Sequence, residues 1–315
     1  MAIEVRRGFR RILLAVDDSP HSAAAATSVA VVAASTGAEV LVLHIWDVEA
    51  AMHLGESREA ADSLVAEVAD RLAAQGITTR ERVRVSPRGE AAEEIEAMVS
   101  DYQPDLLALG SHGRTNLAAL ALGSVSHRVL EHVHCPVLVG RYHPAGSAAE
   151  MTRILLALAG SESDAAAIEL AGDIALSLNA SVVVLHVLRS FMDMTGSAYL
   201  QPSVVTNEVL LPAVRFLNER GLEAEMMVIP GSAPSTIVQT AQANNVGLIV
   251  LGPGRRSSNL AGILDGDTTN DVVHLSDRPI LIAAPKPRRS AVRANHPDTA
   301  RKIGDGWGAG LEGKY

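Results

Sequence analysis

The sequence predicts an α/β protein made of two tandem copies of one domain, each with a parallel sheet packed against helices. Short apolar runs alternate with longer segments of helical period, which is typical of βαβ units. The same succession of segments occurs twice within the 315 residues. Apolar residues make up 48% of the chain and aromatic residues only 3%. The core is therefore built from Ala, Val, Leu and Ile, which favours helices packed on a buried sheet.

The duplication has an almost constant offset. RILLAVDDS at 11–19 returns as RILLALAGS at 153–161, and VLVLHIW at 40–46 returns as VVVLHVL at 182–188. Matched residues lie 142 positions apart, as in the pairs Ile12–Ile154, His44–His186, Gly89–Gly231 and Gly110–Gly252. CPVL at 135–138 and RPIL at 278–281 are 143 apart, so one residue is inserted after Gly252. A repeat of this length indicates a duplicated domain rather than a solenoid module.

The elements of the first copy follow from its apolar runs and helical patterns. Strands are expected near 11–16, 40–46, 81–86, 105–109 and 136–140, and helices near 20–36, 57–75, 90–101 and 123–133. Ser19 suits an N-cap, with Pro20 at the first helical position.

Helix ends in the two copies agree with this assignment. Ser161 and Asp164 of the second copy resemble a capping box. Gly37 and its counterpart Asn179 both tolerate the left-handed conformation that often ends a helix. The segment YHPAGSAAE at 142–150 is rich in Gly, Ser, Pro and Ala and marks the boundary between the copies.

Charge and cysteine usage restrict the partners. The formal net charge is -9, which disfavours nucleic acid and anionic membranes as partners. The single cysteine, Cys135, excludes an intrachain disulfide and fits a reducing cytoplasm. Near the N-terminus the arginines are followed by only five apolar residues, too few for a signal peptide or a membrane span. We therefore expect a cytoplasmic protein.

The segment GSHGRTNLAALALGS at 110–124 joins the fourth predicted strand to a helix. A helix that starts near Ser124 has free backbone N–H groups and a positive dipole end. Gly110, Gly113 and Gly123 are expected to adopt positive φ and to let the backbone approach a ligand. This combination indicates a phosphate site for a nucleotide. The alternative is that the glycines only form tight turns and that Ser124 only caps a helix.

Two common nucleotide motifs are absent from the sequence. VDDSPHS at 16–22, after the first strand, contains no glycine, so it is not a Rossmann fingerprint. GPGRRS at 252–257 lacks the third glycine of that fingerprint. A Walker A loop needs Gly-Lys before Ser or Thr, and the chain has no such string.

The spacing Gly110-x2-Gly113-x9-Gly123-Ser124 is similar to the nucleotide-binding pattern of universal stress proteins, and GSHGRTN…LGSVS resembles their ATP-binding branch. The resemblance covers domains at 8–142 and 150–286. It implies two Rossmann-like (adenine nucleotide alpha hydrolase-like) domains, each a five-stranded parallel sheet of order 3-2-1-4-5 with helices on both faces. That order reverses between strands 1 and 4, where open α/β sheets bind ligands. The remaining tail, 287–315, has many charges and glycines and is expected to be disordered or loosely attached.

The resemblance also implies roles for residues of the first copy, with ATP or a related adenine nucleotide as the ligand. Ala15, Val16 and Ile45 would line the adenine pocket. Asp17 would face the ribose or a phosphate-bound Mg²⁺, a hard cation that prefers oxygen ligands. The sugar and phosphates would be wrapped by Leu109, Gly110, His112 and Gly113, with a charge-assisted contact from Arg114. Donors at the helix N-terminus would come from Gly123, Ser124, Val125 and Ser126.

The second copy departs from this pattern at its chemical positions. Ala159 stands where the first copy has Asp17, and Arg256 takes the place of Gly113. Gly266 keeps the glycine of position 123, but Asp267 replaces Ser124, and a carboxylate there would repel a phosphate. We therefore expect a scaffold domain with a degenerate nucleotide motif. Arg255 and Arg256 leave open a site for another anion.

Other clusters of polar residues are better explained by structure than by chemistry. His127, His132, His134 and Cys135 lie close in sequence, but their spacing does not place ligands on one helix face, so no metal site is expected there. His44 and His186 end equivalent strands, which favours a structural role for both. Cys135 is expected to be a small buried hydrophobe.

Three functions are compatible with the sequence. The first is a stress-response regulator or sensor that binds a nucleotide and is not an enzyme. The second is a slow ATP-hydrolysing enzyme, which needs a base or water-positioning group, and only Asp17, His112 and Arg114 are available for it. The third is a purely structural interaction module. The resemblance further implies that the two fifth strands, 136–140 and 279–283, pair edge to edge as an internal pseudo-dimer, because such apolar edges should not be left open to solvent, and a further homodimer stays open.

Overall fold

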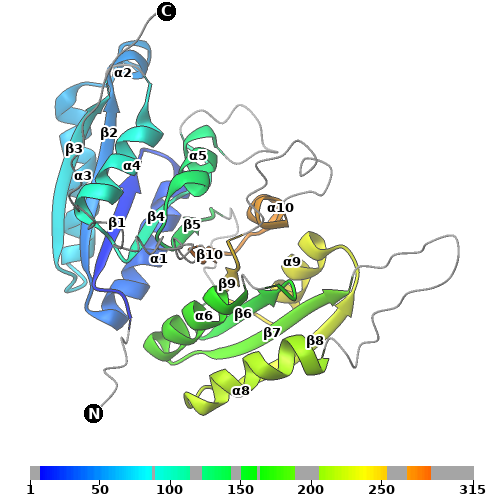
Figure 1. Ribbon diagram of the computed structural model, residues 1–315. Helices are drawn as coiled ribbons and strands as arrows, with labels where there is room; N and C mark the ends of the chain where they lie inside the picture. Colours follow the sequence, from blue (N-terminus) through cyan, green and yellow to red (C-terminus); the bar gives the residue numbers. More distant parts are fainter. Residues whose placement is uncertain are drawn as a thin grey trace, which may run out of the picture.

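The two copies share one continuous sheet in the computed structural model (Figure 1). The structure describes residues 8–86, 89–113, 123–142, 150–161, 164–188, 206–253 and 268–284. The first copy consists of β1 (Arg11–Val16), α1 (Pro20–Thr36), β2 (Glu39–Asp47), α2 (Val48–Leu54), α3 (Arg58–Ala73), β3 (Thr79–Ser86), α4 (Ala91–Tyr102), β4 (Leu106–Gly110), α5 (Ser124–His132) and β5 (Val137–Gly140). The described elements of the second copy are β6 (Arg153–Leu158), α6 (Asp164–Leu178), β7 (Ser181–Leu188), η1 (Thr206–Leu210), α8 (Leu211–Glu219), β8 (Ala224–Pro230), α9 (Ala233–Ala243), β9 (Leu248–Leu251), α10 (Thr268–Leu275) and β10 (Ile280–Ile282).

The strand order of the described sheet is β3-β2-β1-β4-β5-β10-β9-β6-β7-β8. Within each copy all strand pairs are parallel, so the predicted order 3-2-1-4-5 is confirmed in both halves. The central strands β1, β4, β6 and β9 are apolar on both faces, as expected for parallel strands covered on both sides.

The halves meet through their fifth strands, as predicted. β5 and β10 pair antiparallel, with Leu138 opposite Leu281 and Val139 opposite Ile280. These side chains are almost completely buried, so each edge is covered by the other. On one face of the sheet, α1 also packs against α6 across the seam. The internal pseudo-dimer is therefore a single hydrogen-bonded sheet.

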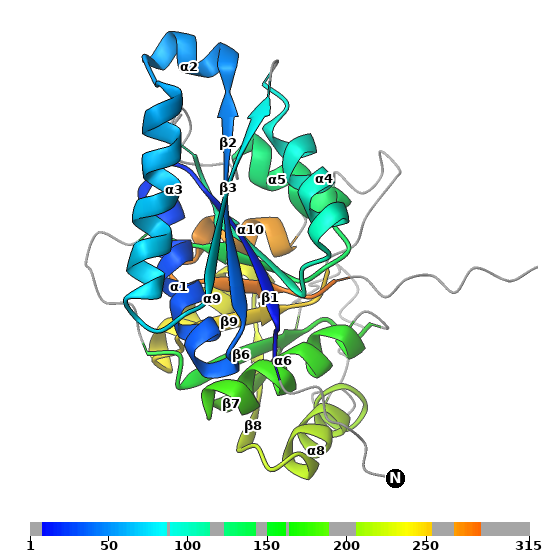
Figure 2. The ribbon, with the colours of Figure 1, turned by 90° about the vertical axis from the view of Figure 1, so that its left-hand side faces the viewer.

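Helices cover both faces of the sheet and divide the core into two layers. Figure 2 shows α1 and α3 on one side of strands β1–β3, and α4 and α5 on the other. The first layer joins residues of α1, α3, α6 and α8 to alternate strand residues such as Leu14 and Leu156. The second joins residues of α4, α5, α9 and α10 to the intervening strand residues such as Leu13 and Leu155. Aliphatic side chains dominate both layers, as the composition predicts.

Local signals predict most helix ends correctly. The Ser19 hydroxyl accepts a hydrogen bond from Ser22 N at 3.1 Å, and Pro20 is the first residue of α1. Gly37 has φ +71° and Asn179 φ +51°, so both adopt the expected left-handed conformation. At the predicted capping box, Asp164 Oδ2 accepts from Ser161 N at 3.1 Å, and residues 162–163 between them lie outside the described ranges.

The short helix α2 is absent from the predicted elements. It has seven residues directly after β2, and Asp47 Oδ1 accepts from Glu49 N at its start. A helix of this length lacks the repeated period that identifies longer ones. None of the helices in the described ranges is long and apolar enough to cross a membrane. The tail at 287–315 lies outside those ranges, as does most of the linker, 143–149.

Candidate functional site

The predicted site lies at the carboxyl ends of β1 and β4. These two strands are neighbours, with Ile12 opposite Leu106 and Leu14 opposite Ala108. The chain runs from β1 outward to β2 and β3 on one side, and from β4 to β5 on the other. Asp17 follows β1 and Gly110 ends β4, so both lie at the crevice where the strand order reverses.

Two of the three glycines in this crevice, Gly110 and Gly113, serve close packing rather than positive φ. The expectation of positive φ at Gly110, Gly113 and Gly123 is wrong, since none of them has it, and Gly123 has φ −57°. A Cβ on Gly110 would lie 2.7 Å from Ser22 N, and one on Gly113 would lie 2.8 Å from Asp17 Oδ2. The loop after β4 therefore lies directly against the turn after β1.

Hydrogen bonds fix the loop in this position. The Ser126 hydroxyl on α5 donates to the Gly110 carbonyl at 2.8 Å, and Gly123 N donates to the Ser111 carbonyl at 2.9 Å. The Ser19 hydroxyl donates to the His112 carbonyl at 3.1 Å and so connects the two turns. The Ser126 hydroxyl, expected as a ligand donor, thus positions the loop.

The carboxylate of Asp17 is fixed in the same way. The backbone N–H of Asp17 donates to the Ser22 hydroxyl at 3.0 Å, and the side-chain Oδ1 accepts from Ser19 N at 3.2 Å. Asp17 is partly exposed, whereas Gly113 and Ser124 are exposed. The crevice therefore combines one fixed carboxylate, exposed loop backbone and the N-terminus of α5.

The remaining predicted residues are mostly apolar and differ in their burial. Buried apolar positions line the strand ends, at Ala15, Val16, Ile45 and Leu109. Val125 is half-buried at the start of α5. Arg114 lies outside the described residues.

A second group of polar residues gathers beside the crevice, at the seam between the copies. Arg141, directly after β5, donates to Ser111 Oγ at 3.0 Å. It also donates to two carbonyls at the C-terminus of α10, those of His274 at 2.9 Å and Ser276 at 2.8 Å. Ser111 Oγ also lies 2.9 Å from His21 Nδ1. Arg141 thus connects the loop of the first copy to a helix of the second.

The imidazole of His112 belongs to this seam cluster. Its ring centroid is 5.1 Å from that of His21 and 6.4 Å from that of His274, and its Nδ1 lies 3.1 Å from Ser111 Oγ. Burial, then the charge of Arg141 and that of His112, lower the pKa of His21 to about 4. Burial and the same two neighbours lower the pKa of His274, against the opposing effect of Asp271. The cluster therefore has one lasting cation, Arg141, beside two histidines, His21 and His274, whose pKa values are lowered.

Sequence reasoning missed most of the seam cluster. His21, Ser111, Arg141 and His274 are far apart in the chain. The first three meet within the first copy, where β4 pairs with β5 and α1 packs against both strands, and the pairing of β5 with β10 adds His274. The antiparallel pairing places the carboxyl end of β5 next to the amino end of β10, where α10 has just ended. The predicted pairing of the fifth strands was the one signal for contacts at the seam, but no sequence motif identifies these residues.

The equivalent turn of the second copy is filled by a carboxylate. Asp164 is 7% exposed, and its oxygens accept from Ala159 N at 3.2 Å, Gly160 N at 2.7 Å and Ser161 N at 3.1 Å. In the first copy this position is Ser22, a neutral hydroxyl. The second copy therefore has a buried negative charge at this turn and no counterpart of Asp17. Its predicted phosphate-loop residues, Arg255, Arg256, Gly266 and Asp267, lie outside the described ranges.

His44, His186 and Cys135 have local partners or are partly buried. His44 Nδ1 lies 2.7 Å from the Val16 carbonyl and His186 Nδ1 lies 2.9 Å from the Leu158 carbonyl, so the equivalent structural roles are confirmed. Burial raises the pKa of the Cys135 thiol to about 11. Across the described residues, no three His, Cys, Asp or Glu side chains form a group able to hold a metal ion.

Comparison with known proteins places both copies in one family. The model of the universal stress protein family matches residues 8–141 and 150–284. A universal stress protein of Methanocaldococcus jannaschii is 29% identical over 143 residues, which covers 42% of this chain and 81% of that protein. One from Thermus aquaticus is 31% identical over 142 residues and is covered to 99%.

Solved structures show the same fold over both copies. The crystal structure of a universal stress protein from Archaeoglobus fulgidus has a TM-score of 0.68 at 19% identity, covering 87% of this chain and 96% of that chain. A universal stress protein solved in complex with cAMP covers 43% of this chain and 99% of that chain, at 21% identity and a TM-score of 0.34.

Proposed function

We propose, from the premise that this chain belongs to the universal stress protein family, that its first copy binds one adenine nucleotide and that the protein acts as a stress-response regulator. The observation that carries the proposal is the contact between two turns. The loop at Gly113 lies against Asp17, and Gly123 brings the start of α5 to the same crevice. Adjacent loop backbone and a helix N-terminus form an anion site at the position where α/β sheets bind ligands.

Each part of the crevice suits one part of the nucleotide. Ala15, Val16 and Ile45 would contact the base, since they are buried strand-end residues beside the opening. The N-terminus of α5 would face the phosphates, because its free N–H groups and dipole favour negative charge. Mg²⁺ commonly binds through one or two carboxylates together with substrate phosphates, so the fixed carboxylate of Asp17 suits it.

A regulatory role is favoured over an enzymatic one by the side chains near the loop. Hydrolysis needs a group that orients or deprotonates the attacking water. The His112 imidazole lies in the seam cluster beside Ser111, and Asp17 accepts from Ser19 N. Both groups are engaged by contacts within the protein, so we expect hydrolysis to be slow and incidental.

The second copy would act as a scaffold. Its turn after β6 has Asp164 where the first copy has Ser22, and that carboxylate already occupies three backbone donors. A phosphate brought to this end of the sheet would meet negative charge. We therefore expect one nucleotide per chain.

Titration calorimetry of the full chain with ATP and Mg²⁺ tests the proposal. A stoichiometry near one is expected, and a value near two would show that the second copy has kept its site. Ser124→Asp or Gly123→Asp should weaken binding at least about tenfold, because a carboxylate replaces uncharged groups at the phosphates. Ser57→Asp is the matched control, since Ser57 is the exposed N-cap of α3 and Asp is an equally good cap.

Two measurements separate the alternatives. Mass spectrometry of protein purified under gentle conditions should find an adenine nucleotide, and protein that neither retains nor binds one would support the structural module instead. Release of inorganic phosphate at turnover rates above about 1 s⁻¹ would support the enzyme, since that is the lower range of ordinary catalysis.

A further inference from the structure

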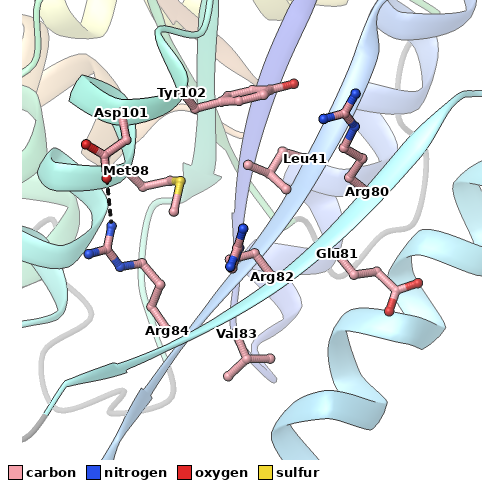
Figure 3. Close-up of a pocket in the computed structure, with 9 residues that line it drawn as sticks. All are labelled: Leu41, Arg80, Glu81, Arg82, Val83, Arg84, Met98, Asp101 and Tyr102. Atoms are coloured by element: carbon pink, nitrogen blue, oxygen red, sulfur yellow. Dashed lines mark ion pairs between the residues drawn. The ribbon is translucent and has the colours of Figure 1, made fainter.

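A pocket of about 520 Å³ lies at the outer edge of the first copy, between β3 and α4. In Figure 3, Arg82 and Arg84 of β3 lie below the side chains of Leu41, Met98 and Tyr102, and Arg80 lies beside Leu41. Pockets of several hundred Å³ are large enough for a small molecule. The nucleotide crevice lies at the ends of β1 and β4, and β2 separates β3 from β1. The pocket is therefore distinct from the nucleotide crevice.

Three arginines share one face of β3. Arg80, Arg82 and Arg84 alternate along the strand, so they point to the side of α4, and Glu81 points away in Figure 3. Arg80 Nε pairs with Glu39 at 2.5 Å, and Arg84 pairs with Glu94 at 2.9 Å and Asp101 at 3.5 Å. Arg82, between them, is exposed, and its guanidinium has no ion pair or hydrogen bond to any of the described residues. The pocket thus contains one uncompensated cation.

The opposite wall is apolar and aromatic. Leu41 and Met98 are 7% and 8% exposed, and they belong to the core layer under α4. Tyr102 is half-buried, with the guanidinium of Arg11 5.6 Å from its ring centroid. Burial and the nearby charge of Glu39 raise the pKa of Tyr102, so its hydroxyl stays a donor at neutral pH. The wall offers a surface for an apolar body and a hydroxyl beside it.

The second copy shows that the fold does not require these arginines. The strand registers pair Leu41 with Arg80 and the equivalent Val183 with Glu225. At the positions of Arg80, Arg82 and Arg84, β8 therefore has Glu225, Met227 and Ile229. Met227 and Ile229 pack against the core layer of α9. Edge strands are often protected by charges, but on this face the edge strand of the second copy has a single charged residue, Glu225.

We propose that this pocket binds a small carboxylate with an apolar body, such as an aromatic or branched aliphatic acid. The carboxylate would pair with Arg82, whose guanidinium is free for a bidentate contact. The apolar body would lie on Leu41, Met98 and the ring of Tyr102. Charge complementarity selects the anion, and the apolar wall selects against small inorganic ions.

The test uses the full chain and a matched pair of ligands. Biphenyl-4-carboxylate and its neutral amide, biphenyl-4-carboxamide, have the same shape and differ in charge. Followed by ¹H–¹⁵N NMR, the carboxylate should shift the signals of β3 and α4, and the amide should bind at least about tenfold more weakly. Rising salt should weaken only the carboxylate, because its contact is ionic and partly exposed.

Two variants locate the contact. Arg82→Gln should weaken the carboxylate about tenfold, and the exposed position of Arg82 leaves the fold unaffected, which circular dichroism checks. Arg71→Gln, the same change at an exposed site on α3, should leave binding unchanged. Equal binding of acid and amide, or full binding by Arg82→Gln, would overturn the proposal. Displacement of the acid by ATP with Mg²⁺ would also overturn it, because it would place the acid in the nucleotide crevice.

Discussion

Single residues in the crevice act mainly through the space that they leave. Gly110 lets the end of β4 approach the backbone of His21 and Ser22, and Gly113 lets the loop approach Asp17. The sequence correctly indicates that these positions must be glycine. The expected positive φ is wrong, because the observed close contacts come from a turn some 90 residues earlier in the chain, and the expected approach of the loop backbone to a ligand stays a prediction. Local patterns contain no information on such distant contacts.

Gly110→Ala should destabilise the protein by about 1–3 kcal/mol, because overpacking against backbone cannot be relieved by a rotamer change. Its Cβ would lie 2.7 Å from Ser22 N and 2.8 Å from His21 C. Gly123→Ala is the control, since its Cβ would lie 3.4 Å from the nearest atoms and its φ of −57° suits alanine. The control should lose no more than about 1 kcal/mol as an N-cap change. Urea unfolding measures both, and equal losses would contradict the packing argument.

His21 should make the fold sensitive to mild acid. Its pKa is lowered to about 4 in the folded chain, from an ordinary value of 6.5. Between these values the unfolded chain binds a proton that the folded chain does not, so this residue lowers stability as pH falls from 6.5 toward 4. His21→Asn should reduce that slope in the free energy of unfolding. A His21 imidazole that titrates near 6.5 by NMR would contradict the expectation.

Elements of secondary structure could largely be predicted because each has its own period and ends. The strands β1 to β5 and the helices α1, α3, α4 and α5 lie within two residues of their expected bounds. The exception is α2, which is short and has no period. The contact between Arg141, after β5, and the end of α10 could not be predicted. It depends on which carbonyls of that helix lie at the seam. Arg141 contacts two of them, and cations are favourable at helix C-termini.

Arg141→Gln should destabilise the full chain by about 2–4 kcal/mol. The guanidinium is partly buried and donates to Ser111 and to two carbonyls near the end of α10, and charge-assisted bonds contribute about 1.5–3 kcal/mol each. Glutamine can replace only part of this set. Chemical denaturation measures the loss of stability, with Arg71→Gln at an exposed position of α3 as the control. A loss as small as that of the control would show that the seam does not depend on these bonds.

At the scale of the whole molecule, pairing of β5 with β10 removes two open edges at the centre of the sheet. The outer strands β3 and β8 remain as edges, and both contain charged residues. The family resemblance of both copies, together with two apolar fifth strands that would otherwise be open edges, is sufficient to predict this arrangement. The pocket on β3 could not be predicted from the duplication, because its arginines occur in one copy alone.

A chain shortened to residues 1–142 should self-associate. It would expose β5, whose four residues are all buried in the full chain, and an apolar edge strand readily pairs with another copy. Light scattering after size-exclusion chromatography should find dimers or larger species, with the full chain at the same concentration as the reference. A soluble half that stays monomeric and still binds nucleotide would contradict this expectation.

Joining the copies in one chain has a consequence for how the seam can evolve. Between two identical chains, a mutation at the shared strands appears at both ends of the pair, because one gene encodes both. Here the segments CPVLVGR at 135–141 and RPILIAA at 278–284 correspond, so Arg141 stands at one end and Ala284 at the other. Selection can therefore adjust the end beside the crevice without imposing the same change on the opposite end. Each half is free to acquire a separate task while the sheet that unites them is preserved.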